Sequence, residues 1–360
     1  MTIEHVHAPL SKVAADWLIA VANPIHAAAS ASMLPLPWEI ASVLWAAELH
    51  GVLPVALRAL SPSNNGQGTA PFEGGGRDVE LARQAIANAR TRQLHQTGFE
   101  LLLRHHAEKT LTALRAAGVA AAILKGPVFA RRLYVQPTLR TFTDIDILIP
   151  FEARAAASEV LQRGPFRSQM RDYREGKDYC EDQWVLDEDP RISIEIHTDL
   201  VHNPKLRRAA SVALADVINA GNGDAEDATA ILFVAAVHGA VSHQFDRLQH
   251  LVDVALAANC AAGEVDVGRL AAAARASGLM TAVHGALVLA GTAFSDARCR
   301  ALAKALRPSA LDRLASGLVT PRAVLDARSS RRSTSSWRRK ALRQAIRLGG
   351  SRHPAQKYSV

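Results

Sequence analysis

The sequence predicts an α+β fold in which a small mixed β-sheet is surrounded by extensive alanine-rich helical additions. Three observations support this class. Of the 360 residues, 49% are hydrophobic but only 5% are aromatic, and much of the apolar content is alanine. Two short segments, 142–149 and 192–197, have the residue types and the two-residue period of strands. The long segments before and after them have helical spacing instead.

The first 90 residues are expected to form an N-terminal helical region with a glycine-rich loop. Within it, segment 38–49 places its apolar residues at roughly helical spacing. Segment 61–77 is rich in Gly, Ser and Asn, which is typical of a flexible surface loop. Residues 79–117 are expected to form one long or broken helix that leads into the next region.

The region from 91 to 205 carries the candidate chemistry. Asp144 and Asp146 lie two residues apart on the first strand, so they share one face of it. Two adjacent carboxylates repel each other, and a divalent ion such as Mg²⁺ removes the repulsion because it takes oxygen ligands. The second strand carries Glu195 and His197 on one face. If the two strands are neighbours, Glu195 can join the aspartates around Mg²⁺ or Mn²⁺.

A Lys-Gly turn precedes the aspartate strand. An apolar run, 120–124, is followed by Lys125, Gly126 and Pro127 and then by a helix-like stretch, 128–134. Glycine lets a backbone approach a ligand closely, and proline suits the first position of a helix. A helix N-terminus and a lysine both favour phosphate. The turn is therefore expected to bind phosphate.

This order of elements resembles the nucleotidyltransferase superfamily of the DNA polymerase β type. More narrowly, the chain is similar to a bacterial family of uncharacterised nucleotidyltransferases with an L-K-G turn, a Y-x2-P-x2-R-x3-D-x-D segment and an E-x-H strand. The residues that match these motifs are Leu124, Lys125, Gly126, Tyr134, Pro137, Arg140, Asp144, Asp146, Glu195 and His197. The resemblance covers roughly residues 90 to 255.

The resemblance implies transfer of an NMP group from ATP or another NTP to a hydroxyl or phosphate of a small-molecule, peptide or protein acceptor. It also implies the roles of individual residues. Those expected to be catalytic and to hold Mg²⁺ or Mn²⁺ are Asp144, Asp146 and Glu195. Those expected to bind the nucleotide are Lys125, Gly126, Arg140 and His197. One departure from the superfamily is Pro127, which stands where a phosphate-binding serine is usual.

Two alternative functions stay open from the sequence. D-x-D also serves metal-dependent glycosyltransferases, which would require a larger parallel sheet before the motif. A catalytically degenerate nucleotide-binding or interaction protein is favoured slightly by Pro127, whereas three acids kept together count against it. His197 itself is open among four roles: metal ligand, orienter of Glu195, base, or simply a hydrogen-bonded histidine.

Segments flanking the second strand are less informative. Residues 166–186 are expected to form a hairpin or lid, where Arg171, Arg174 and Lys177 either contact phosphates or form a solvated face. Residues 206–320 are expected to form a helical domain. The narrow family carries an H-G … L-x-x-L-x-D pattern there, which His238, Arg247 and Asp253 match. A His–Asp or Arg–Asp pair that ties these helices to the sheet is the preferred interpretation.

The net charge of +8 comes from the last forty residues. Residues 321–360 hold eleven Lys or Arg and one acid, so the rest of the chain carries −2. This region is expected to be a flexible tail that is either simply solvated or binds an anionic partner, such as nucleic acid or an anionic membrane, and its residues 338–348 have the pattern of a short basic amphipathic helix. Three cysteines without a C-x-x-C pair fit a reducing cytoplasm. No apolar run is long enough for a transmembrane segment, and no signal peptide is evident.

Overall fold

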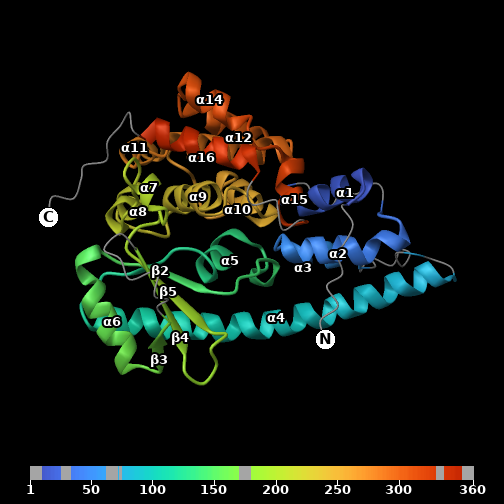
Figure 1. Ribbon diagram of the computed structural model, residues 1–360, viewed down its shortest axis with the longest axis horizontal. Helices are drawn as coiled ribbons and strands as arrows, with labels where there is room; N and C mark the ends of the chain where they lie inside the picture. Colours follow the sequence, from blue (N-terminus) through green and yellow to red (C-terminus); the bar gives the residue numbers. More distant parts are fainter. Residues whose placement is uncertain are drawn as a thin grey trace.

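The computed structural model describes residues 10–25, 34–61, 72, 75–169, 180–329 and 336–350. It confirms the predicted α+β class: one five-stranded mixed sheet lies among many helices (Figure 1). The glycine-rich loop and the basic residues Arg171, Arg174 and Lys177 of the expected lid lie largely outside the described residues.

The sheet has the strand order β1-β2-β5-β4-β3. Strands β2 and β5 are parallel neighbours, whereas β1, β4 and β3 each pair antiparallel with their neighbours. The bounds are Ala122–Ile123 for β1, Ile145–Leu148 for β2, Phe166–Ser168 for β3, Glu181–Leu186 for β4 and Ser193–His197 for β5. The expected hairpin is thus present as β3 and β4, and both predicted strands exist, the first of them shorter than expected.

One face of the sheet packs on two helices. Alternate isoleucines of β2 and β5, among them Ile145, Ile147 and Ile194, are fully buried in an apolar cluster with residues of α4 (Arg77–Ala116) and α6 (Arg154–Arg163). Each such side chain contributes about 1.5–3 kcal/mol by leaving water. The period-two pattern therefore works as expected, because it sends the isoleucines to this core and the acids to the opposite face.

Helix α4 is unbroken over 40 residues. It runs under the sheet at one end and under the N-terminal helices at the other (Figure 1). These helices are α1 (Lys12–Ala22), α2 (Ile40–Leu49) and α3 (Leu53–Ala59), with a short 3₁₀ turn, η1 (Pro37–Glu39), before α2.

The opposite face of the sheet lies beneath a thick helical layer (Figure 1). At its centre is α9 (Ala228–Val237), whose ten residues are all buried, as expected for a helix that is apolar all round. It continues into a π-helical turn, η5 (His238–Ser242), and then into α10 (Leu248–Ala258). The remaining helices are α5 (Pro127–Leu133), α7 (Pro204–Arg207), α8 (Leu214–Ala220), α11 (Val267–Ala276), α12 (Met280–Ala293), α13 (Ala297–Ala305) and α14 (Ala310–Ser316), with short 3₁₀ turns η2 (Pro137–Leu139) and η3 (Phe151–Ala153).

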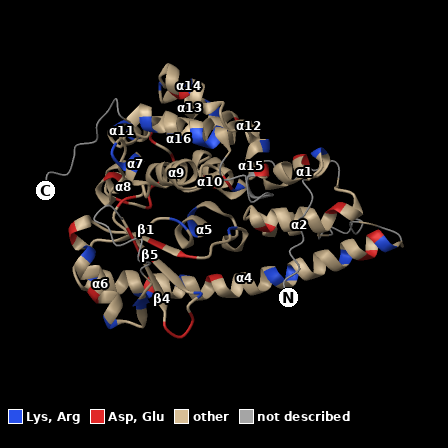
Figure 2. Cartoon of the chain, in the orientation of Figure 1, with Lys and Arg blue, Asp and Glu red and all other residues tan. Residues whose placement is uncertain are grey.

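The basic C-terminal region differs from the expected flexible tail where the structure describes it. It contains α15 (Pro321–Ser329) and α16 (Trp337–Gly350), and Lys and Arg positions are prominent along α16 (Figure 2). Arg339 is 3% exposed and donates hydrogen bonds to the backbone carbonyls of Gln244, Phe245 and Ala323. Apolar residues of α16, such as Leu342 and Ile346, join the main core. The predicted short basic helix over 338–348 is thus confirmed as α16. Its packing against the core was not predicted, because the composition of a helix with one apolar stripe is still basic overall.

Among the residues that the structure describes, no helix combines the length and the apolar character that crossing a bilayer requires.

Candidate active site

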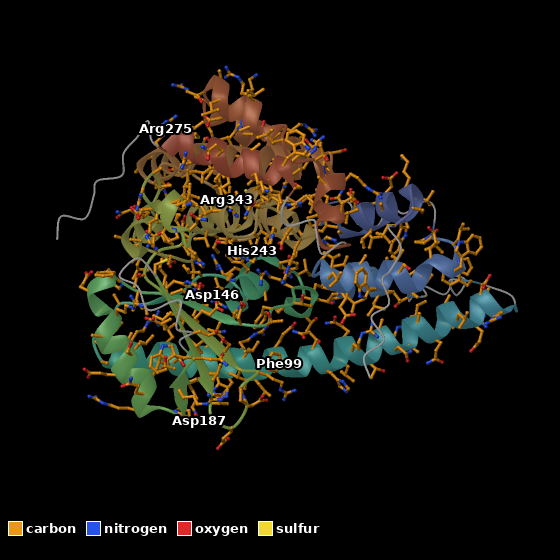
Figure 3. The ribbon with its side chains drawn as sticks, viewed as in Figure 1. Phe99, Asp146, Asp187, His243, Arg275 and Arg343 are labelled. Atoms are coloured by element: carbon orange, nitrogen blue, oxygen red, sulfur yellow. The ribbon has the colours of Figure 1, made fainter. Side chains whose placement is uncertain are left out.

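A cavity of about 250 Å³ lies between the acidic face of the sheet and the helical layer. Figure 3 labels one residue on each side of this interface, Asp146 from β2 and His243 from the helices. The side chains that line the cavity are Leu124, Lys125, Asp144, Asp146, Glu181, Glu195, His197, Leu200, His202, Val234, His238, Ser242 and His243. Of the seven site residues predicted from the sequence, five line this cavity. A sixth, Gly126, directly follows the lining residue Lys125, and the seventh, Arg140, is not in the lining.

The three predicted carboxylates come together as the strand order requires. Asp146 of β2 is the register partner of Glu195 on the parallel strand β5, so both side chains project from the same face. Asp144 lies in the bend just before β2 and lines the same cavity. The condition on which the metal hypothesis depended, that the two strands are neighbours, is therefore met.

Lys125 forms an ion pair with one of these acids. Its Nζ lies 3.0 Å from Oδ2 of Asp146, and both side chains are largely buried. Burial alone would raise the pKa of Asp146, but Lys125 and His197 outweigh it and hold that pKa well below the usual range. Asp146 is therefore ionised at neutral pH.

His197 contacts the same aspartate from the other side. Its Nε2 lies 3.0 Å from Oδ1 of Asp146 and 3.7 Å from Oε2 of Glu195. Burial would lower the pKa of His197, yet the bond to Asp146 and its charge raise it. His197 also stacks on His202 with ring centroids 4.8 Å apart, and Nδ1 of His202 lies 3.1 Å from Oε2 of Glu181. The two histidines thus connect three carboxylates.

The cavity is lined by four carboxylates but by a single lysine. Burial and the charge of Asp146 raise the pKa of Glu195 to about 7, and they also raise the pKa of Asp144. Such shifts report carboxylates that lack sufficient positive charge nearby. One donor atom each from Asp146, Glu195 and His197 lie within 4.8 Å of one another. A buried, oxygen-rich set of this kind fits a divalent cation.

This donor set differs in one member from the predicted trio. His197 completes the compact group with Asp146 and Glu195, whereas Asp144 lines the cavity at the edge of the strand. A second compact group consists of Glu181, His197 and His202. The sequence offered a signal for His202, which follows the second strand closely, but none for Glu181, because its approach depends on β4 pairing with β5.

Gly126 supplies the turn beside Lys125. Its φ of +51° and ψ of −110° lie outside the region that side-chain-bearing residues adopt easily. A Cβ at this position would lie 3.4 Å from the ring of Phe142 and 3.5 Å from the carbonyl oxygen of Asp144. Helix α5 starts at Pro127 as predicted. The turn therefore holds Lys125 against the aspartates.

Arg140 lies outside the cavity lining, unlike Lys125 and His197, which were also expected to bind nucleotide. It is 3% exposed, and its Nε and Nη2 donate to the two carboxylate oxygens of Asp253 on α10 at 3.0 and 2.9 Å. The hydroxyl of Tyr134 donates to the same carboxylate at 2.7 Å. An Arg–Asp pair thus ties the helices to the segment before β2, and the arginine is Arg140 rather than Arg247.

Comparison with protein-family models identifies the class to which this fold and site belong. A family described as uncharacterised nucleotidyltransferases matches residues 37–295. The chain belongs to this family. The match extends well beyond the region on which the motif resemblance was based, since it takes in α2, α3 and the helical layer as far as α12. Comparison with curated proteins and with solved structures finds no match for the chain.

Proposed function

We propose that this protein transfers a nucleoside monophosphate group from a nucleoside triphosphate to a hydroxyl or phosphate of an acceptor, in a reaction that requires Mg²⁺ or Mn²⁺. The observation that carries the proposal is the register of Asp146 with Glu195, beside Lys125, in one cavity. Membership of a nucleotidyltransferase family supports the reaction class.

In this proposal the acids hold the divalent ion and Lys125 binds the substrate phosphates. Asp146, Glu195 and Asp144 offer the oxygen ligands, and His197 orients Asp146 through their 3.0 Å contact. The ion, when bound, stabilises negative charge on the phosphates and on the attacking oxygen. Lys125 sits at the wall with its ammonium group beside these acids, where it can also neutralise phosphate oxygens.

The bond changes are simple. An acceptor oxygen forms a bond to the α-phosphorus as the bond to the leaving pyrophosphate breaks, and a hydroxyl acceptor gives its proton to solvent. Catalysis of phosphoryl-type transfer consists mostly of positioning and charge stabilisation. The rigid placement of Lys125 and Asp146 on neighbouring backbone segments suits that task, because Leu124 N also donates to the carbonyl of Asp146 at 3.1 Å.

The alternative of a D-x-D glycosyltransferase receives less support from the fold. That function was expected to need a larger parallel sheet before the motif. In the described residues, the strand before the motif, β1, has two residues and pairs antiparallel, and β2 with β5 is the parallel pair. The small mixed sheet accords better with nucleotidyl transfer.

The test is transfer of label from α-³²P-labelled ATP, CTP, GTP and UTP to acceptors in a cell extract and to the protein itself, with Mg²⁺ or Mn²⁺. We expect label to be transferred by the wild type and lost in Asp144→Asn and Glu195→Gln. Asp187→Asn is the matched control, because this carboxylate directly follows β4 but is exposed, at 56%, and does not line the cavity.

Two outcomes would contradict the proposal. Transfer that survives in both cavity variants would remove these acids from the reaction. Tight binding of Mg-ATP by calorimetry without any labelled product from the four nucleotides would favour the degenerate, nucleotide-binding alternative.

A further inference from the structure

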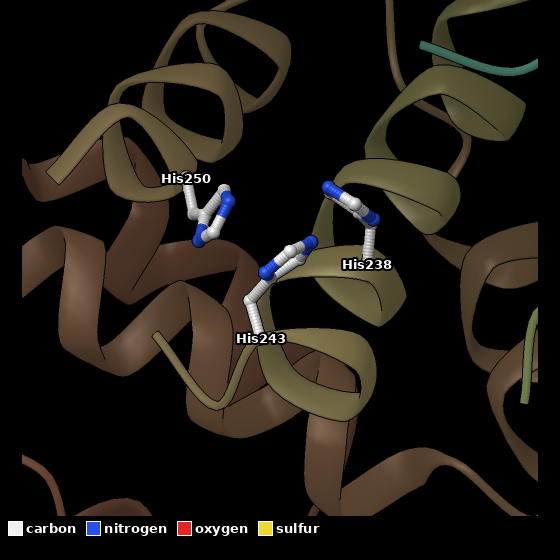
Figure 4. Close-up of side chains that lie close together, drawn as sticks. All are labelled: His238, His243 and His250. Carbon is white, nitrogen blue, oxygen red and sulfur yellow. The ribbon is translucent and has the colours of Figure 1, made fainter. Parts of the chain in front are cut away.

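Three histidines cluster on the helical wall of the cavity, opposite the carboxylates. His238 begins the π-helical turn η5, His243 follows that turn, and His250 lies on α10 (Figure 4). Their ring centroids are 4.5, 4.7 and 5.3 Å apart. One nitrogen of each lies within 4.8 Å of the other two. The sequence signal was three histidines within thirteen residues, of which the family pattern used only His238.

The local backbone is shaped to bring the rings together. A π-turn is uncommon and is frequent at functional sites. Directly after it, Gln244 and Phe245 have φ values of +51° and +55°, which side-chain-bearing residues rarely adopt. A Cβ on Gly239 would lie 3.2 Å from both Cβ of His250 and the Phe245 ring. Close approach of η5 to α10 therefore depends on this glycine.

Burial and nearby cations favour the neutral form of two of the imidazoles. Burial, the charges of Lys125 and Arg140 and the neighbouring histidines hold the pKa of both His238 and His250 well below the usual value. Neutral imidazole is the form that ligates metals. These cations oppose a bound metal ion, but the carboxylate of Asp246 adjoins the cluster and offsets part of their charge.

The polar atoms of His250 point to a missing partner. This side chain is 4% exposed, and its Nδ1 is buried without a hydrogen-bond partner among the described residues. The Nδ1 atoms of His243 and His250 lie 3.6 and 3.8 Å from Oδ1 of Asp246. Both distances are too long for a hydrogen bond, so Asp246 places negative charge beside the cluster without satisfying Nδ1 of His250. A buried polar atom without a partner itself calls for an ion or water.

We propose that His238, His243 and His250 form a second metal site, which takes a borderline transition-metal ion of the Zn²⁺ type. Three imidazoles suit Zn²⁺ and disfavour Mg²⁺, which requires oxygen ligands. His238 and His243 line the cavity, so the fourth position of a tetrahedral ion faces it, as in open three-histidine zinc sites. The cavity would thus have an oxygen-donor wall and a nitrogen-donor wall.

The test is metal binding by the full-length protein, and it does not depend on transferase activity. Dialysed protein is titrated with Co²⁺, followed by its visible absorption, and the Co²⁺ is then displaced with Zn²⁺. The titration uses a His197→Gln background, because His197 belongs to both other compact donor groups. With excess Mg²⁺, which the histidines do not bind, present to occupy the carboxylates, we expect one equivalent of Co²⁺. Binding should be at least a hundredfold weaker after either His243→Gln or His250→Gln.

The matched control is His284→Gln, which changes a histidine on α12 that is as buried as His250 but does not line the cavity. It should bind Co²⁺ as the background protein does. His243→Gln is the deciding variant, since its side chain is 31% exposed and its loss leaves no closed void. Unchanged Co²⁺ affinity in His243→Gln, or no binding in the background protein, would overturn the proposal.

Discussion

Two buried clusters of charge lie on either side of the Lys125-Gly126 turn, and they are balanced differently. In the sealed cluster, Arg140 meets Asp253 through two short hydrogen bonds, and both side chains are at most 4% exposed. In the cavity cluster, Lys125 faces several acids, and burial together with Asp146 raises the pKa of Glu195 to about 7.

This difference in charge balance distinguishes residues that stabilise the fold from residues that can bind a ligand. A buried pair whose charges match and whose hydrogen bonds are made needs no further ligand, and removing one member leaves the other charge stranded. A cavity wall with excess negative charge is stabilised by a cation that arrives from outside. The motif residues Tyr134 and Arg140 therefore belong to the first kind, whereas Asp146 and Glu195 belong to the second.

The largest expected effect comes from Asp253→Asn. The substitution keeps the shape but leaves Arg140 buried without its counter-charge, so we expect a loss of about 3–5 kcal/mol in the free energy of unfolding, measured by urea denaturation. The double variant Arg140→Met/Asp253→Leu should recover most of this loss. A single variant that costs less than about 1 kcal/mol would show that the pair does not support the fold.

The same change from aspartate to asparagine in the cavity should reduce activity strongly and stability only to a smaller extent. Asp146→Asn is expected to lower the rate of label transfer at least a hundredfold, because the proposed metal ligand is lost. The free energy of unfolding should fall by less than in Asp253→Asn, since Asp144 and Glu195 remain beside Lys125 after the substitution. A large loss of stability with transfer intact would reverse the roles assigned to the two clusters.

Glu100 on α4 is a buried acid for which the structure gives no ion pair among the described residues, and its effect is expected in the pH dependence of stability. It is 2% exposed and accepts hydrogen bonds from the side chain of Gln96 and the backbone of Phe142. Burial raises its pKa to about 7, above the unfolded value of 4.5, so the folded state retains a proton that the unfolded state releases. Stability is thus expected to fall as pH rises from about 4.5 to about 7, by on the order of 2 kcal/mol.

Glu100→Gln should remove that pH dependence. Urea unfolding of both proteins at pH 5 and pH 8 measures this dependence. The free energy of unfolding of the variant, relative to that of the wild type, should be about 2 kcal/mol higher at pH 8 than at pH 5. Parallel stability profiles for the two proteins would mean that Glu100 is ionised in the fold at both.

The smallest effect is expected where the two clusters meet, at Gly126. Gly126→Ala must adopt a positive φ and should cost about 1–2 kcal/mol. It should also raise the KM for the nucleotide, because Lys125 moves with the turn. The control is Gly98→Ala in α4, where a methyl group meets nothing within 4 Å and should stabilise the helix by about 0.5–1 kcal/mol. A neutral Gly126→Ala would show that the turn relaxes without consequence.

Much of the site was predictable because its geometry is local. Two aspartates two residues apart on a strand must share a face, and the same rule places Glu195 with His197. Proline at the first helical position and the glycine before it predicted the start of α5 correctly. The long helix α4 and the pair β3 and β4 also followed from periodicity and composition.

The parts that were wrong or missing depend on partners far apart in the chain. Arg140 meets Asp253 113 residues away, and the sequence cannot distinguish this pair from one made by Arg247. His197 reaches Asp146 across 51 residues, and Glu181 reaches the site through strand pairing. Arg339 appeared to belong to a solvated tail because two of its three carbonyl partners, those of Gln244 and Phe245, are nearly a hundred positions earlier.

The sequence alone determined which residues alternate on strands, where the helices fall and which acids stand side by side on one strand, because backbone geometry repeats every two or 3.6 residues. The tertiary structure decided which charges are matched and sealed and which remain facing the cavity. That choice depends on the parallel register of β2 with β5 and on the docking of α10 and η5 over the sheet, and neither leaves a periodic trace in the chain.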